Sequence, residues 1–76
     1  MEKKNFKKEV KITNLLDYWK VEFADAKHYE YIKQLLTNKH YEIKIDDLVL
    51  LVRGNKAMRE VITYCIRNSI DFEVVF

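Results

Sequence analysis

The chain contains no proline, only one glycine (Gly54) and only one cysteine (Cys65). Because proline and glycine most often interrupt regular structure, their scarcity predicts a chain that is mostly helix and strand with short connections. A lone cysteine excludes an internal disulfide, and a small secreted domain would normally need such bridges. We therefore expect a reducing, cytoplasmic location.

Long apolar segments are also missing from the sequence. No run approaches the roughly 18 residues of a membrane span. The charged residues 1–9 are not followed by an apolar stretch of the kind found in signal peptides. A chain of 76 residues with 49% apolar side chains predicts one folded domain rather than a disordered segment.

Charge is nearly balanced, with fourteen basic and twelve acidic residues and a net charge of +2. Residues 1–9 are predicted to be a flexible basic arm, because five lysines lie within the first eleven residues. These lysines are Lys3, Lys4, Lys7, Lys8 and Lys11. Residues 12–76 contain nine basic and ten acidic residues, so the folded part lacks the broad positive field of a dedicated nucleic-acid-binding domain.

The first half of the domain has a strand–helix–strand pattern. Residues 18–24 alternate as in a strand with one buried face, and Asp25 is suited to cap a following helix. Apolar residues then recur at helical spacing, and Asn38 is suited to end the helix. The helical positions are Ala26, Tyr29, Ile32, Leu35 and Leu36. Residues 41–45 alternate again, which predicts a second strand.

The second half repeats this order. Asp46 and Asp47 form the only turn signal before residues 48–52, which are apolar on both faces and so predict an interior strand. Asn55 is expected to cap a second helix, and residues 72–76 form the last strand. The apolar stripe of this helix is Met58, Val61, Ile62, Cys65 and Ile66.

The order βαββαβ predicts an α+β domain of the ferredoxin-like class over residues 10–76. Its four-stranded antiparallel sheet would have both helices on one face, because crossover connections are right-handed. Residues 10–17 remain open between two interpretations. Val10 and Ile12 alternate as in an extra strand, whereas residues 14–17 could form a helical turn.

A sheet of this kind leaves one face without helices. The residues expected beneath the helices are Trp19, Val21, Phe23, Tyr41, Ile43, Ile45, Phe72, Val74 and Phe76. Those expected on the bare face are Tyr18, Lys20, Glu22, Glu42, Lys44, Glu73 and Val75, with either Leu48, Leu50 and Val52 or Val49, Leu51 and Arg53. Aliphatic side chains on such a face are usually covered. The cover could be residues 10–16, a second copy in a homodimer, or another protein.

Several chemistries find no support in the sequence. Metal-transfer domains of this topology need a Cys-x-x-Cys pair, and Cys65 is better explained as a small core residue. His28 and His40 lie at opposite ends of a helix and are expected at the surface. No glycine-rich phosphate loop follows the first strand. We therefore predict no metal, no cofactor and no enzymatic activity.

Nucleic-acid binding is the main alternative. RNA-recognition domains of this topology stack bases on aromatic side chains of the central strands. Residues 48–53 contain no aromatic side chain. Tyr18, with the basic residues Lys20 and Arg53, is a weak replacement for the aromatic residues that such domains use to stack bases. The five lysines of the arm and its junction could add non-specific attraction to phosphates.

Part of the sequence resembles a known family. Five segments carry the resemblance, namely residues 21–25, Leu35-Leu36, residues 41–43, residues 50–53 and residues 68–74. Together they resemble the ferredoxin-like domain appended to the ATPase subunits of bacterial ABC exporters of the bacteriocin and lantibiotic type. The resemblance covers residues 18–76 and implies a regulatory or docking role without catalytic residues, as an accessory domain of a transporter system.

The sequence therefore favours a small non-enzymatic protein that binds another protein. A regulator or inhibitor of a host protein, encoded by a phage or another mobile element and similar in kind to anti-CRISPR proteins, would fit this description. Tyrosine is a residue type that often contributes strongly to interfaces. The predicted contact residues are Tyr18, Lys20, Glu22 and Lys44 of the bare face, with Tyr31 and Tyr64 as exposed aromatic residues of the helices.

Overall fold

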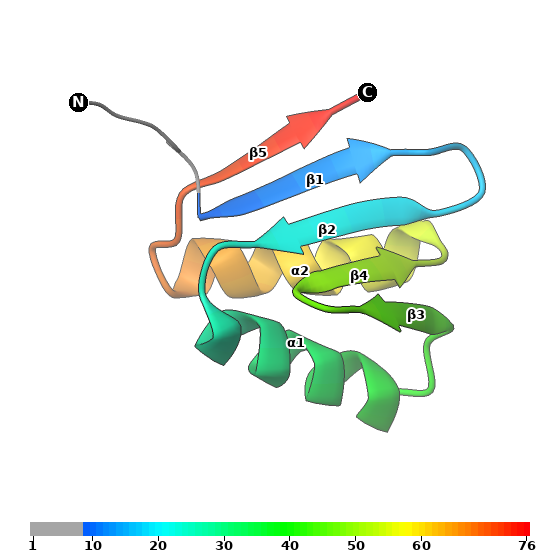
Figure 1. Cartoon of the computed structure of the whole chain (residues 1–76), viewed down its shortest axis with the longest axis horizontal. Coiled ribbons are helices and arrows are strands. Elements are labelled where there is room, and N and C mark those ends of the chain that lie inside the picture. Colours follow the sequence, from blue (N-terminus) through cyan, green and yellow to red (C-terminus); the bar gives the residue numbers. More distant parts are fainter. Residues whose placement is uncertain (1–8) are drawn as a thin grey trace.

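The sheet has five strands and is mixed, so the predicted four-stranded antiparallel sheet is wrong (Figure 1). The computed structural model describes residues 9–76. The elements in chain order are β1 (Val10–Asn14), β2 (Trp19–Phe23), α1 (Ala26–Asn38), β3 (Ile43–Asp46), β4 (Val49–Val52), α2 (Asn55–Arg67) and β5 (Phe72–Val75). The strand order is β3-β4-β2-β1-β5. From β2 onward, the elements follow the predicted βαββαβ succession. The arm lysines Lys3, Lys4, Lys7 and Lys8 lie outside the described residues.

β1 accounts for the difference from the predicted sheet. It lies between β2 and β5, antiparallel to the first and parallel to the second. Of the two interpretations of residues 10–17, the strand is confirmed for residues 10–14, and the helical turn is wrong, because a tight non-helical turn follows the strand. In this turn the Asn14 side chain accepts a hydrogen bond of 2.9 Å from the amide of Leu16, whose φ is 74°. Residues 10–14 therefore join the sheet, and they do not fold over its bare face.

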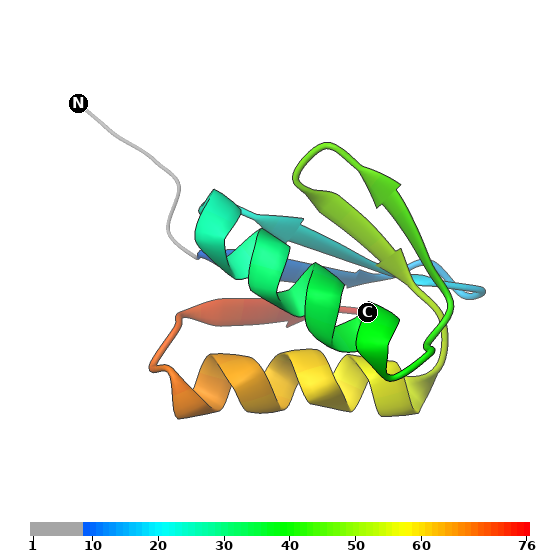
Figure 2. The ribbon, with the colours of Figure 1, turned by 90° about the horizontal axis from the view of Figure 1, so that it is seen from below.

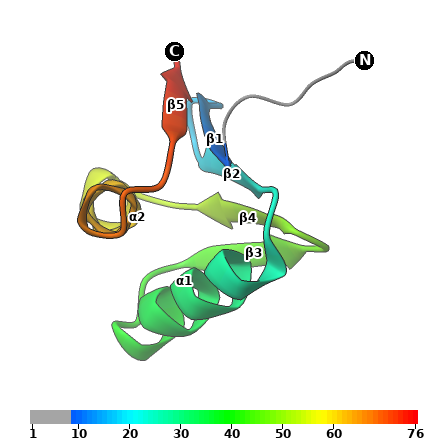
Figure 3. The same cartoon turned by 90° about the vertical axis from the view of Figure 1, so that its left-hand side faces the viewer.

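Both helices cover the same face of the sheet, as predicted (Figures 2 and 3). Each helix has 13 residues, and within residues 9–76 none is long and apolar enough to cross a membrane. The core lies between the helices and the sheet. Its buried members are Val10, Ile12, Val21, Phe23, Tyr29, Ile32, Leu36, Leu50, Val52, Ala57, Met58, Val61, Cys65 and Ile70.

Two residues expected beneath the helices are instead exposed. Ile45 is 57% exposed and Phe76 is 88% exposed. Ile45 belongs to the edge strand β3, and Phe76 follows the opposite edge strand β5, so both lie where helix coverage ends. Ile66 of the predicted α2 stripe is likewise 64% exposed. The remaining sheet residues expected at the core are buried or partly buried.

The helix ends follow the sequence signals only in part. Asp25 caps α1 as predicted, with its carboxylate accepting from the Lys27 amide at 2.8 Å. The predicted cap of α2 is wrong, because Asn55 is the first helical residue and Gly54 occupies the cap position. Gly54 has a φ of 97°, which glycine adopts without steric cost. After α1, the left-handed residue is His40 and not Asn38.

We predict that shortening Ile12 of β1 destabilises the whole fold. Ile12 is fully buried, so Ile12→Ala removes apolar contacts on the helix side of the sheet and should lower the free energy of unfolding by about 2–5 kcal/mol. Thr13 points to the other face, and Thr13→Ala is the control, with an expected loss under about 1 kcal/mol. Urea unfolding followed by circular dichroism measures both. If Ile12→Ala lowers the free energy of unfolding no more than Thr13→Ala does, β1 contributes little to the core.

Candidate functional site

The face of the sheet without helices, which we call the outer face, carries three rows of side chains across the strands. The first row is Glu42, Arg53 and Tyr18. The second row is Lys44, Leu51, Lys20, Thr13 and Val75. The third row is Asp46, Val49, Glu22, Lys11 and Glu73. Within residues 9–76, no helix or strand covers these rows.

The predicted orientation of the bare-face residues is confirmed by these registers. Of the two alternatives for residues 48–53, the structure has Val49, Leu51 and Arg53 on the outer face, with Leu50 and Val52 in the core. Lys11, Thr13 and Asp46 were missing from the predicted face. Assigning residues 10–14 to a strand would have placed Lys11 and Thr13 there, because side chains alternate along a strand.

Charge on the outer face is balanced. The basic members are Lys11, Lys20, Lys44 and Arg53. The acidic members are Glu22, Glu42, Asp46 and Glu73. Four charges of each sign cancel, so this face lacks the positive field that attracts a phosphate backbone.

The two aliphatic side chains of β4 on the outer face each lie between two charges of the same sign, positive beside Leu51 and negative beside Val49. In the second row Leu51 is between Lys44 and Lys20, and in the third row Val49 is between Asp46 and Glu22. Both aliphatic side chains are partly exposed. The strip formed by Val49 and Leu51 therefore has a positive pair of neighbours at one end and a negative pair at the other.

Tyr18 sits at the end of the outer face in a small polar cluster. Its hydroxyl donates to the Glu42 carboxylate at 3.3 Å, and Arg53 Nη1 lies 3.6 Å from that carboxylate. The Lys44 ammonium is 5.0 Å and the Arg53 guanidinium is 5.7 Å from the centre of the Tyr18 ring. Because two cations already lie over the ring, the ring is not a free surface for stacking a base.

The two predicted contact residues of the helices lie on the other side of the molecule. Tyr31 and Tyr64 stack on each other, with ring centres 4.8 Å apart and an angle of 23° between the rings. Tyr31 is 54% exposed, but Tyr64 is partly buried, which corrects the expectation that both are exposed. The six predicted contact residues therefore belong to two separate surfaces, one on the sheet and one on the helices.

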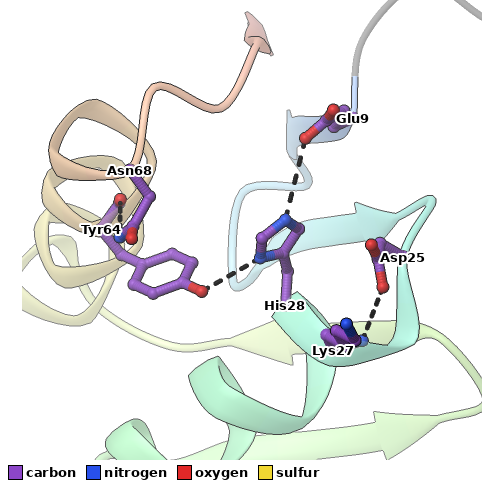
Figure 4. A network of polar contacts seen from close by, with 6 residues as sticks. All are labelled: Glu9, Asp25, Lys27, His28, Tyr64 and Asn68. Atoms are coloured by element: carbon purple, nitrogen blue, oxygen red, sulfur yellow. Dashed lines mark hydrogen bonds and ion pairs between the residues drawn. The ribbon is translucent and has the colours of Figure 1, made fainter.

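Tyr64 takes part in a polar network that joins three elements (Figure 4). Its hydroxyl is 3.0 Å from His28 Nδ1, and His28 Nε2 is 3.8 Å from the Glu9 carboxylate. Burial, followed by the neighbouring Tyr31, raises the pKa of the Tyr64 hydroxyl. His28 is thus a partly buried connector between the start of β1 and α2, which corrects its expected surface position, whereas His40 is exposed.

An open groove of about 390 Å³ runs between the helices beside these tyrosines. Lys39 and Glu60 form an ion pair of 2.9 Å within it, and this contact raises the pKa of Lys39. The groove is lined by Tyr31, Leu35, Lys39, Glu60, Thr63, Tyr64, Arg67 and Asn68. The cation and the anion of this pair satisfy each other, so neither is an unpaired group directed at a ligand.

Cys65 is a core residue, as predicted. It is 1% exposed, and burial raises the pKa of its thiol to about 11. A thiol that keeps its proton at neutral pH is a poor nucleophile and a poor metal ligand. Among residues 9–76, no three His, Cys, Asp or Glu side chains gather as they would to bind a metal ion.

Comparison with known proteins gives no relative, since no family model, no curated protein and no solved structure matches the chain. The resemblance to exporter-associated domains stays a prediction.

We predict that the Cys65 thiol makes stability fall with rising pH between about 9 and 11. Above pH 9 the unfolded chain loses the thiol proton while the folded chain keeps it, so the unfolded state binds fewer protons and becomes relatively favoured. Urea unfolding measures how much the free energy of unfolding falls between pH 8 and pH 11. This fall should be smaller in Cys65→Ala than in the wild type, because the variant lacks the thiol and the two proteins share all other titrating groups. An equal loss in both proteins would contradict the assigned burial of the thiol.

Proposed function

We propose that this protein is a non-enzymatic protein-binding module whose outer face is the contact surface. The observation that supports the proposal is the Val49–Leu51 strip, which remains partly exposed on a sheet face that no other described element covers. Pairing of β1 within the sheet removes the one segment of residues 9–76 that was expected to cover this strip. Aliphatic groups in such a position are usually buried against something.

The arrangement of charges indicates what the partner surface should contain. An apolar ridge would cover Val49 and Leu51, with acidic groups facing Lys20 and Lys44 at one end. Basic groups would face Glu22 at the other end. Complementary charges of this kind orient a partner and exclude wrong ones more than they add affinity.

Tyr18 and Arg53 are the residues of the outer face best suited to contribute strongly to binding. Tyrosine and arginine are enriched among residues whose truncation costs most at interfaces. Here their side chains support each other, because both contact Glu42. A surface of this kind suits a protein that regulates or inhibits its partner by occupying part of the partner's surface.

Nucleic-acid binding through this face is less well supported. The four positive and four negative side chains cancel, and the Tyr18 ring is flanked by Lys44 and Arg53. Fluorescence anisotropy with a labelled single-stranded oligonucleotide at low salt tests this alternative. Binding that is lost with Tyr18→Ala would favour the nucleic-acid interpretation and contradict the proposal.

The main test compares two matched double variants in binding to a partner captured from cells and then purified. Lys20→Glu with Lys44→Glu reverses two charges on the outer face. Lys27→Glu with Lys56→Glu reverses two exposed charges in the first turns of the helices, where glutamate is well tolerated. Titration calorimetry should show the Kd rising about tenfold or more for the first variant, with little change for the second.

Mapping the contact by NMR makes the same test independent of substitutions. On addition of the purified partner, the amide resonances of Lys20, Glu22 and Leu51 should shift or broaden. Those of the exposed positions of α1, such as Gln34, should remain in place. The reverse pattern, or equal loss of affinity in both double variants, would place the interface elsewhere and overturn the proposal.

A further inference from the structure

The two edges of the sheet differ in how they are protected from pairing with another strand. Natural sheets protect an edge with charged side chains, especially lysine. Edge strand β3 carries Lys44 and Asp46 in its four residues. Edge strand β5 carries a single charge, Glu73, and it is followed by Phe76. The β5 edge is therefore the less protected of the two.

Backbone groups of β5 are available on this edge. The carbonyl of Asp71 accepts from the amide of Val10 at 3.1 Å, so the backbone of Asp71 faces β1. Successive residues of a strand direct their amide and carbonyl groups to alternate edges. Phe72 and Val74 therefore direct these groups away from β1, to the side where residues 9–76 provide no further strand.

The side chains next to this edge are unusually apolar. Figure 3 shows β5 at the edge of the sheet, on the side of α2 away from α1. Phe72 and Val74 are only partly buried, and Phe76 is 88% exposed. Trp19, Val74 and Phe76 line an open hollow of about 470 Å³ together with Met58 and Ile62 of α2.

Ile66 extends the same apolar surface to the start of β5. It follows Ile62 by four residues, so the two side chains lie on one side of α2. Ile66 is 64% exposed, and it is the second-last residue of α2, which is followed by β5. An exposed apolar residue is thus present near each end of the strand.

We propose that a second copy of this chain pairs with β5 in antiparallel orientation, with a two-fold axis at Val74. In this register Phe72 lies opposite the partner's Phe76. The ring of the partner's Phe76 is thereby brought toward the turn of α2 that carries Ile66 in the first copy. The register also places Glu73 opposite the partner's Val75. A two-fold interface repeats each contact, so both ends of the strand are covered in the same way.

Electrostatics distinguishes this register from its neighbour. Pairing about Glu73 would place two glutamates directly opposite each other, which is unfavourable in an antiparallel pair. Pairing about Val74 has no like charges opposite each other and uses the outward backbone groups of Phe72 and Val74. The resulting sheet would continue through both copies and present two outer faces side by side. This inference concerns the edge of the sheet and does not depend on the function proposed for its outer face.

A matched pair of substitutions tests the edge. Ile66→Asp introduces a charge beside β5, and Ile45→Asp introduces the same charge at the β3 edge in a side chain of similar exposure (64% and 57%). Sedimentation velocity on the full chain should show a concentration-dependent dimer, weakened about tenfold or more by Ile66→Asp and unchanged by Ile45→Asp. A wild-type protein that stays monomeric over about a hundredfold range of concentration overturns the proposal. So does a dimer that only Ile45→Asp weakens.

Cross-linking tests the register. Glu73 and the partner's Val75 would form a pair without mutual hydrogen bonds, with Cα atoms about 4.5 Å apart, which a disulfide can bridge. A mixture of Glu73→Cys and Val75→Cys proteins should form a disulfide-linked dimer on mild oxidation, and neither variant should do so alone. Because Cys65 is buried, it does not compete. Cross-linking of Glu73→Cys with itself would show the other register and contradict the axis at Val74.

Discussion

The architecture depends on the burial of one side of β1 between β2 and β5. Val10 and Ile12 are fully buried, and they align with Phe23 and Val21 on one neighbour and with Phe72 and Val74 on the other. Because side chains alternate along a strand, this alignment also decides which residues of the adjoining strands reach the outer face. A slip of one residue would bury Lys11 and Thr13 and expose Val10 and Ile12, which the core does not permit.

Prediction from the sequence succeeded where a periodic pattern was strong and unbroken. The alternation of residues 18–24 and the helical spacing in α1 identified the buried side, and Asp25 marked the start of the helix. At residues 10–17 the pattern could not identify the strand. The strand has only two buried apolar residues, Val10 and Ile12, and the two leucines of the following turn obscure their alternation. The parallel pairing of β1 with β5 is non-local, and nothing in either segment specifies it alone.

The sequence also did not show how far the neighbouring layer covers residues at the edges of the fold. Ile45 and Ile66 obey the periodicity of their elements, yet both are exposed. Periodicity reports which side of a strand or helix an amino acid occupies, but not how far the neighbouring layer extends. The same limit applies to the tyrosines, since Tyr31 and Tyr64 pair with each other on the helices while Tyr18 pairs with cations on the sheet. Their separation could be inferred only after the fold was known.

The pairing of β1 with β5 also constrains how the chain can be assembled. Among the strands of residues 9–76, β1 is synthesised before the others, but one of its two neighbours consists of residues 72–75. Until those residues have left the ribosome, β1 can pair only with β2, and its other edge, with Val10 and Ile12 beside it, lacks a partner. The sheet therefore closes late, in a step that joins distant segments and carries a substantial loop-closure cost. A nascent chain that stalls before this step would present an unpaired strand that is prone to wrong contacts.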